Sequence, residues 1–363
     1  MKSKRQLSRR EFLKLSGLSF SALALPGLQP RFLRPQSDFP LGSRLGRVTD
    51  EGGANLRTRP SSQAPDAGRL PGDTVVEWLR EVVGYTEYRN QRWVETPQGY
   101  IWAPLVQPVM NLPNEPLESI PDYGSGPGLW MEVTVPYVDV VLANPPARGF
   151  RIQYLVENFQ PIRFYYRQVF WVDGLRAGDQ GTEYHVRELH GARGDEFWAP
   201  AEAFKPINPQ DVTPISPEVD DKLLIVNISR QTLSCVEAGR EVHFCRVSTG
   251  DYGEGRKTPV GDNLQVFMKY FSIHMEGGST GGGYDLSGIS WATFIATGGI
   301  AVHSTYWHNN FGERTSAGCV NASPEDARFV FRWSNPEVPY YPGTRQLSAS
   351  DQFAGTRVRV VEV

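Results

Sequence analysis

Cysteine is scarce in this chain of 363 residues: there are three, at positions 235, 245 and 319, beside six histidines. An odd number of cysteines leaves at least one thiol without an internal disulfide partner. Cys235 and Cys245 lie on what read as the two arms of a hairpin around Ala238-Gly239. They could form a cross-strand disulfide or be two small buried apolar side chains, and we prefer the second interpretation. Cys319 is the free thiol in either case.

Basic runs are missing beyond the first 24 residues. The formal net charge is −3, and residues 1–24 alone contribute +5, from six Lys or Arg side chains against Glu11. The rest of the chain therefore carries −8. An acidic body without a basic patch argues against nucleic acid as a partner.

The apolar run at residues 15–25 is shorter than the stretch of about 20 residues that spans a bilayer. It follows an Arg-Arg pair within residues 8–14, SRREFLK, and together they resemble a twin-arginine export signal. The alternative is a basic N-terminus that arose by chance. The resemblance implies export of the folded chain to the periplasm or cell wall. Ala22 and Ala24 suit a cleavage site, but Pro26 follows closely, so an uncleaved signal that anchors the chain to the membrane stays open.

Ligand spacing typical of a metal site is not found. His303, His308 and Cys319 could together bind zinc, but no second Cys/His pair follows them and the nearby acidic residues are not spaced as ligands. We therefore expect no metal.

Glycine (36) and proline (28) are abundant, and 40% of the residues are hydrophobic. This composition favours a loop-rich, mainly β protein, and the length predicts two or three domains of roughly 100–200 residues each. Short alternating runs separated by turn residues at 46–108 predict a small barrel. The barrel resembles bacterial SH3-like domains, which implies either a spacer or a site for wall peptide or glycan.

The expected order of segments alternates domains with Pro- and Gly-rich linkers. It is an export signal or anchor at 1–29, a linker at 30–45, the barrel at 46–108, a linker at 109–128, a second small β domain (also SH3-like) at 129–205, a linker at 206–220 and a catalytic domain at 221–363.

Within the last segment, strands are predicted at 222–227, 231–237, 241–248, 263–270 and 356–361. Residues 277–288 are too rich in glycine for a regular element and are expected to form a long mobile loop. A helix is predicted over 323–334, because Ser323 is a good N-cap, Pro324 suits the first position and Asp326 lies three residues on.

Chemistry is concentrated in residues 303–321, HSTYWHNNFGERTSAGCVN. A cysteine attacks as its thiolate, and a nearby imidazole is the commonest means of making one. We therefore predict that Cys319 is a nucleophile and His303 its base. The N–H groups of Gly318 and Cys319 can form an oxyanion hole, and the helix predicted shortly after Cys319 should favour the thiolate.

Residues 221–363 resemble an L,D-transpeptidase catalytic domain of the YkuD type. The family pattern is a histidine, a short gap, Ser-His-Gly-Cys, an apolar residue and Asn or Arg, which His303 and residues 316–321 match. Segments 231–233, 248–250 and 258–261 match further family features in the same order. The resemblance implies a β-sandwich with a short helix after the catalytic cysteine, preceded by one or two SH3-like barrels, and no cofactor.

The resemblance also implies roles for neighbouring residues. The backbone carbonyl of Ser304 would orient the His303 ring, and Ser316 or Asn321 would brace the turn or bind substrate. His308 could instead be a surface residue. The candidate substrate-binding residues are Asn321, Tyr306, Trp307, His308 and Tyr284.

The chain departs from the family pattern at Ala317, where the family has a histidine. Because the family assigns the base to the upstream histidine, matched by His303, activity remains plausible. What is lost is an imidazole near the oxyanion hole.

The implied substrate is a peptidoglycan stem peptide. Cys319 would attack the carbonyl of the third residue of a tetrapeptide stem, D-alanine would leave, and the thioester would pass its acyl group to an amine of a neighbouring stem, giving a 3–3 cross-link. Water as acceptor would make the protein an L,D-carboxypeptidase, and an amine of a wall-bound protein would give anchoring. The rival class is a catalytically impaired wall-binding protein, which Ala317 and the barrels favour.

Overall fold

The computed structural model describes residues 39, 44–123, 126–251, 253, 255–277, 283–351 and 354–363. The export signal predicted at 1–29 and nearly all of the linker predicted at 30–45 lie outside these residues. Pro40–Val363 form one unit, which is distinct from Met1–Phe39. Strands dominate the described chain, so the mainly β fold is confirmed. No helix in the described part of the chain is long and apolar enough to cross a bilayer.

Residues 44–109, the first β region, form two small sheets. One has the order β4-β1-β8 and the other β3-β2-β7-β6-β5. The apolar side chains of alternate strand positions meet in a core that includes Val48, Leu56, Trp78, Val94 and Ile101. The strands are β1 (Leu45–Val48), β2 (Ala54–Arg57), β3 (Asp66–Leu70), β4 (Val75–Glu77), β5 (Arg80–Val83), β6 (Arg92–Thr96), β7 (Gly99–Trp102) and β8 (Val106–Val109), with a 3₁₀ turn η1 (Ala103–Leu105) before β8. Their assignment to the SH3-like family stays a prediction.

Residues 129–206, the second β region, form a seven-stranded sheet with the order β11-β10-β14-β13-β12-β9-β15. Its strands are β9 (Leu129–Val133), β10 (Tyr137–Leu142), β11 (Ile162–Tyr165), β12 (Val169–Gly178), β13 (Gly181–Arg187), β14 (Glu196–Pro200) and β15 (Phe204–Pro206). A helix that the sequence analysis did not anticipate, α2 (Phe150–Glu157), connects β10 to β11. Trp130 and Trp171 of this sheet belong to the core of the C-terminal region, so the two regions share apolar packing.

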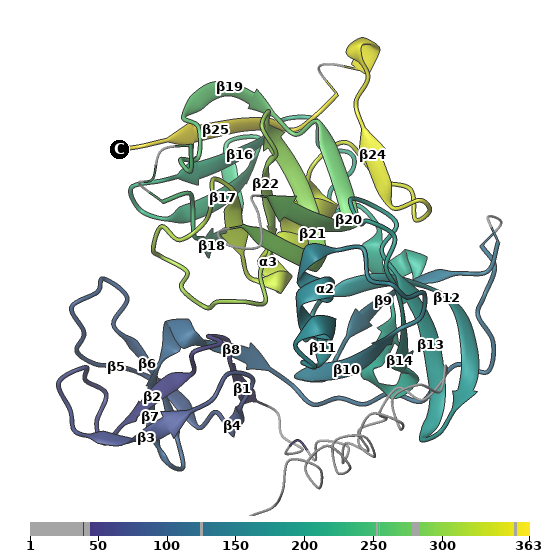
Figure 1. The fold of residues 1–363 in the computed structure, drawn as a ribbon. Helices are drawn as coiled ribbons and strands as arrows, with labels where there is room; N and C mark the ends of the chain where they lie inside the picture. The colour runs from purple at the N-terminus through teal and green to yellow at the C-terminus, as the bar shows by residue number, and fades with distance from the viewer. Residues whose placement is uncertain are drawn as a thin grey trace, which may run out of the picture. The chain divides into compact units, whose positions relative to one another are not determined.

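The C-terminal region is built from two five-stranded sheets. The first, β18-β17-β16-β25-β19, contains β16 (Lys222–Asn227), β17 (Thr232–Glu237), β18 (Arg240–Arg246), β19 (Gly261–Gln265) and β25 (Arg357–Val361). The second, β23-β22-β21-β20-β24, contains β20 (Met268–Gly277), β21 (Tyr284–Ala296), β22 (Ile300–Ser304), β23 (Val320–Ala322) and β24 (Thr344–Gln346). Side chains from both sheets and from α3 (Pro324–Trp333) share one core, and α3 packs against β21, β22 and β23 (Figure 1).

The predicted elements of this region hold with two corrections. The helix begins where expected, and the Ser323 hydroxyl accepts a hydrogen bond from the Asp326 N–H. Residues 263–270 do not form one strand. Strand β19 ends at Gln265 and β20 begins at Met268, and between them the Val266 N–H donates to the Thr356 carbonyl. Part of the loop predicted at 277–288 is not described, because residues 278–282 lie outside the described chain; its ends differ from the prediction, since Gly277 belongs to β20 and β21 already begins at Tyr284.

Both hairpin cysteines are free and buried, which is the interpretation that the sequence favoured. Cys235 lies opposite His243 in the β17–β18 pair, and Cys245 lies opposite Leu233. The two thiols are therefore offset along the strands rather than directly facing.

Candidate active site

Cys319 follows a glycine that no other residue could replace without strain. Gly318 has φ +127°, and a Cβ placed there would lie 2.8 Å from Ile300 Cδ1. L-residues rarely adopt this backbone region. The turn thus brings the backbone close to the start of β22, where the Cys319 thiol donates to the Gly299 carbonyl at 3.4 Å.

Two side chains, those of Ser316 and Thr258, hold the Gly318-Cys319 turn. The Ser316 hydroxyl donates to the Cys319 carbonyl and accepts from the Gly318 N–H at 3.1 Å. The Thr258 hydroxyl donates to the Gly318 carbonyl at 2.7 Å and itself accepts from the Gly250 N–H at 2.9 Å. Gly250 and Ser316 also form a parallel β-bridge. The predicted motifs at 248–250 and 258–261 therefore converge on the Gly318-Cys319 turn.

This bonding changes one expected role. Because the Gly318 N–H already donates to Ser316, the Gly318 amide is committed to bracing the turn. The Cys319 N–H stays the candidate donor to an oxyanion. Ser316 acts as the brace that the sequence suggested.

His303 and Cys319 are aligned by a parallel strand pair. In β22 and β23, Val302 lies opposite Val320 and His303 opposite Asn321. Continued by one residue, the same register brings Cys319 to Ala301, and the Ala301 backbone does contact the thiol. Ala301 and His303 are two residues apart on one strand, so their side chains share a face about 6.6 Å apart.

The His303 ring is held in one tautomer. It is buried, with 3% of its surface exposed, and its Nδ1 lies 2.8 Å from the Ser304 carbonyl. A carbonyl oxygen only accepts, so Nδ1 carries the proton of the neutral ring and Nε2 keeps its lone pair. The Ser304 hydroxyl in turn lies 2.6 Å from Ser290 Oγ. The Ser304 carbonyl thus orients the ring as the sequence analysis expected, leaving Nε2 available as a base.

Burial keeps both groups of the pair neutral. It lowers the pKa of His303 to about 4, against the opposing effect of the Ser304 hydrogen bond. Burial also raises the pKa of the Cys319 thiol, although the Ala301 backbone hydrogen bond opposes this. Desolvation favours the neutral form of each group, and the expected effect of the following helix on the Cys319 thiolate stays a prediction. In the resting site Cys319 is therefore a thiol and His303 a neutral imidazole.

His308 is partly buried and binds Asn321. The Asn310 N–H donates to His308 Nδ1 at 3.1 Å, so the proton of the neutral ring sits on Nε2. Nε2 lies 2.9 Å from the side-chain amide of Asn321. Because Nε2 carries the proton, it donates, and the amide must accept with its oxygen. The other end of this amide is buried and has no partner among the described residues. Burial, with His303 nearby, lowers the pKa of His308 to about 3.

The remaining substrate-binding candidates have different surroundings. The Trp307 ring lies 5.9 Å from the His303 ring, between centroids. Tyr284 is 43% exposed, and its pKa is raised by partial burial and by Cys319, which places it near the thiol. The Tyr306 ring stacks on Tyr165 of the second β region, with 5.3 Å between the ring centroids, and a role of Tyr306 in substrate binding stays a prediction.

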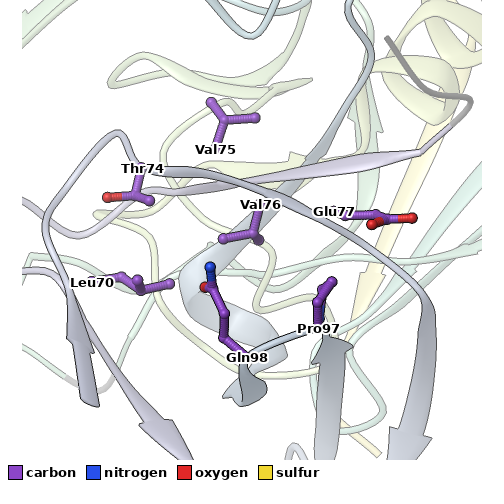
Figure 2. A pocket seen from close by; sticks show the side chains of 7 residues that line it. All are labelled: Leu70, Thr74, Val75, Val76, Glu77, Pro97 and Gln98. Atoms are coloured by element: carbon purple, nitrogen blue, oxygen red, sulfur yellow. The ribbon is translucent and has the colours of Figure 1, made fainter. Parts of the chain in front are cut away.

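Potential metal ligands gather elsewhere. In the described residues, the groups with ligand atoms within 4.8 Å are His243, Cys245 and Asp326, and His274, Glu276 and Asp285. Neither group includes His303, His308 or Cys319. A shallow pocket of about 250 Å³ lies in the first β region, between Leu70, Thr74–Glu77 and the turn at Pro97-Gln98 (Figure 2). It contains none of the predicted site residues.

Sequence reasoning missed the residues that hold the site from a distance. Thr258 was noted only as part of a motif, and its bond to Gly318 spans 60 residues. Arg47 donates to the Tyr306 carbonyl from 259 residues away. The Thr-Pro-x-Gly turn was a usable signal for Thr258, whereas nothing in the sequence pointed to Arg47.

Comparisons with known proteins concern mainly the C-terminal region. Residues 221–360 match the family model of the YkuD L,D-transpeptidase catalytic domain. No curated protein matches the chain. Solved structures that it resembles include an Enterococcus faecium L,D-transpeptidase C442S mutant (19% identity, TM-score 0.31, 40% of this chain and 51% of that one). They also include a Mycobacterium smegmatis L,D-transpeptidase (19% identity, TM-score 0.30, 52% and 81%). This chain thus spans about half the length of the Enterococcus protein. The family match identifies residues 221–360 as a YkuD-type L,D-transpeptidase catalytic domain.

Proposed function

We propose that this protein is a peptidoglycan L,D-transpeptidase that uses Cys319 as nucleophile and forms 3–3 cross-links. The observation that carries the proposal is the tautomer of His303. Its Nδ1–H is fixed by the Ser304 carbonyl at 2.8 Å, so its basic Nε2 is free on the strand face that the register aligns with Cys319.

The first half-reaction follows from the neutral resting pair. As Cys319 Sγ bonds to the carbonyl carbon of the third stem residue, its proton passes to His303 Nε2. The carbonyl oxygen becomes an oxyanion, for which the Cys319 N–H is the candidate donor. When this intermediate collapses, the C–N bond to D-alanine breaks and the amine leaves with the proton from His303. A thioester remains on Cys319.

The second half-reaction regenerates the thiol. An amine of a neighbouring stem attacks the thioester, His303 accepts its proton, and the C–S bond breaks as Cys319 recovers that proton. The buried, unpartnered end of the Asn321 amide is suited to hydrogen-bond a backbone group of the stem, because burial without a partner is costly. Water in place of the amine would give an L,D-carboxypeptidase by the same steps. Export by the twin-arginine pathway would bring the chain to its substrate.

The decisive experiment combines mass spectrometry with product analysis. The purified protein is incubated with a carbapenem, and intact mass is expected to show one adduct that is lost in Cys319→Ala. With defined tetrapeptide stems, the wild type should give 3–3 dimers and Cys319→Ala none. Unchanged products from Cys319→Ala would exclude it as the nucleophile.

A wall-binding protein with impaired catalysis is the second candidate, favoured by Ala317 and by the raised pKa of the Cys319 thiol. It predicts no carbapenem adduct and no dimers, but sedimentation of the protein with purified wall sacculi. Adduct formation at a rate typical of an active enzyme excludes it.

A further inference from the structure

The residues that follow the proposed base form an irregular segment, 305–311 (TYWHNNF), between β22 and the Cys319 turn. It carries Trp307, next to the His303 ring, and His308, which binds Asn321. An irregular segment lacks the regular backbone hydrogen bonds of a strand or helix. Its backbone groups must therefore find partners elsewhere, and several of them lie in the first β region.

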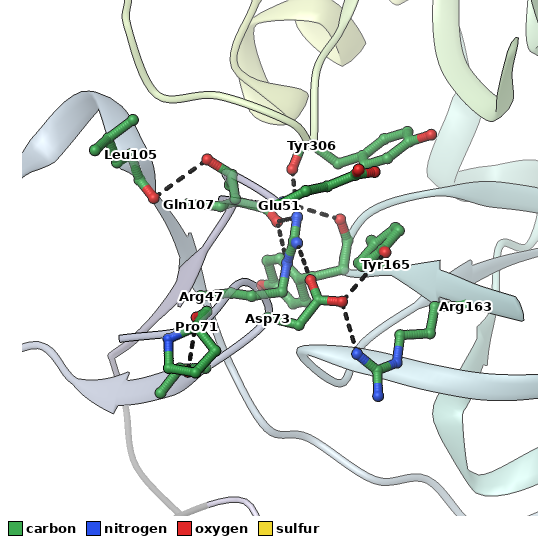
Figure 3. A network of polar contacts seen from close by, with 12 residues as sticks. Arg47, Glu51, Pro71, Asp73, Leu105, Gln107, Arg163, Tyr165 and Tyr306 are labelled. Atoms are coloured by element: carbon green, nitrogen blue, oxygen red, sulfur yellow. Dashed lines mark hydrogen bonds and ion pairs between the residues drawn. The ribbon is translucent and has the colours of Figure 1, made fainter. Parts of the chain in front are cut away.

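Arg47 of β1 binds the start of this segment. It is 2% exposed, and its Nη2 donates to the Tyr306 carbonyl at 2.5 Å (Figure 3). The same guanidinium donates to Gln107 Oε1 at 2.8 Å and to Asp73 Oδ1 at 2.7 Å. A buried cation is tolerated only when it is fully paired. Arg47 therefore commits two side chains of the first β region to holding one backbone carbonyl beside the proposed site.

The second β region completes this network. Asp73 also pairs with Arg163 of β11 at 2.7 Å, and the Arg47 guanidinium lies 4.1 Å over the Tyr165 ring. Tyr165 stacks on Tyr306 at 5.3 Å with the ring planes 16° apart. Tyr306 is thus held by its carbonyl from one region and by its ring from another.

A separate set of bonds holds the far end of the segment. Arg92 Nη2 donates to the Asn309 carbonyl at 2.8 Å, and the Asn309 N–H donates to the Pro104 carbonyl at 3.0 Å. The Asn90 side-chain amide donates to Asn310 Oδ1 at 3.1 Å. Contacts at positions 306, 309 and 310 therefore bracket Trp307 and His308.

A domain that serves only as a spacer needs none of these bonds. We propose that the first β region completes the active site: Arg47 and Arg92 are positioning residues that fix the 305–311 segment, so that His308 holds Asn321 beside Cys319. This inference rests on the proposed function. It assigns the first β region a part in the reaction that does not require it to bind wall polymer.

The test uses substitutions in the full chain. Arg92 is the better target, because its side chain is 28% exposed and is less critical to folding than buried Arg47. Arg92→Met removes the bond to Asn309, whereas Arg92→Lys keeps one donor of suitable length. Arg69→Met is the matched control: this exposed arginine of the same region binds Asn55 and Gly52 and does not contact the 305–311 segment.

Carbapenem acylation of Cys319, followed by intact mass, should slow by roughly ten- to a hundredfold in Arg92→Met, because small misplacements of catalytic groups cost this much. Arg92→Lys should recover most of the rate, and Arg69→Met should stay within about twofold of wild type. Thermal midpoints are measured on all variants. A loss of rate in Arg92→Met that Arg92→Lys does not restore, or that Arg69→Met shares, would overturn the inference.

A double-variant experiment tests the route through His308. If Arg92 acts by fixing His308, then His308→Gln combined with Arg92→Met should be no slower than His308→Gln alone. Multiplied losses would mean that the two residues act independently, which contradicts the proposed route.

Hydrogen exchange makes the test independent of the proposed function. Arg92→Met should speed amide exchange in peptides covering 305–311 and 318–322, while Arg69→Met should not. If the wild type forms no carbapenem adduct, the proposed function fails, yet the exchange data still decide whether the first β region orders this segment. Unchanged exchange in Arg92→Met would refute the positioning role.

Discussion

Of two buried histidines on the same sheet, one is neutral and the other is positively charged at neutral pH. His303 lies on β22 and His274 on β20, on either side of β21. The His303 ring is hydrogen-bonded through Nδ1 to the neutral Ser304 carbonyl, and burial lowers the pKa of His303 to about 4. His274 lies between Glu188 at 2.7 Å and Asp285 at 2.8 Å, which raise its pKa to about 10 despite burial.

The difference shows that burial alone does not decide what a histidine does. Desolvation removes the charge from His303, and a neutral ring with a free Nε2 can accept a proton. Two carboxylates restore the charge on His274, and an imidazolium has no lone pair to offer. His274 ties β20 to β21 and to Glu188, which follows β13 of the second β region, so its role is structural, whereas His303 is suited to chemistry.

The largest expected effect comes from removing the neutral histidine. His303→Gln should lower kcat for dimer formation by about 10²–10⁴-fold, because general-base assistance is lost. Its thermal midpoint should stay near that of wild type, since no charge is left unpaired. Steady-state assays with defined stems and calorimetry measure the two quantities. Retained turnover would assign the base to another residue and erase the contrast with His274.

Removing the charged histidine should have the reverse effect. His274→Gln leaves Glu188 and Asp285 buried without their cation, which should destabilise the protein by on the order of 3–5 kcal/mol. Acylation of the fraction that remains folded should change little. Chemical denaturation measures the loss. The control is His185→Gln, whose side chain is 21% exposed beside Asp173, and which should cost at most about 1 kcal/mol. Equal costs at the two positions would contradict the proposed charge on His274.

The pH dependence should separate the two histidines further. For His274 the folded pKa, about 10, is above the ordinary 6.5, so its contribution to stability is complete below pH 6.5 and is lost as pH rises through about 10. Glu188, Asp285 and the nearby Arg193–Glu276 ion pair are the charged groups around it. The stability difference between wild type and His274→Gln should therefore shrink above neutral pH.

His303 should show its effect in kinetics at acid pH. Because its pKa is about 4, the acid limb of kcat/KM for acylation should lie near pH 4 instead of near the ordinary 6.5. His308, lowered to about 3, is the neighbouring titratable ring and stays neutral over the same range. Initial acylation rates from pH 3.5 to 8 would reveal the limb. A limb near 6.5 would mean that the base is a solvated histidine.

The hydrogen-bond partner of His303 could be predicted from the sequence, but the partners of His274 could not. His303 stands at a fixed place in a local motif, and Ser304, which orients it, is the next residue. Helix α3 was equally local, because its Ser323 cap and Pro324 are adjacent. His274 depends on Glu188, 86 residues earlier. Such pairings are set by how the sheets stack, and no period or spacing in one sequence encodes them. The commitment of Tyr306 to Tyr165 was missed for the same reason.

The smallest effect is expected from Ala317→His, which introduces an exposed histidine to compare with His303 and His274. Ala317 is exposed beside the Gly318 turn, so Ala317→His would place there an imidazole without the burial that lowers the pKa of His303. We expect the acylation rate to rise by a few-fold at most, or the range of accepted substrates to widen, because in the proposed mechanism His303 already supplies the base. The gain should titrate near pH 6.5, well separated from the limb of His303. Ala317→Gln is the control, since it has similar bulk and no titration. Equal turnover in wild type and both variants would show that position 317 has no part in catalysis.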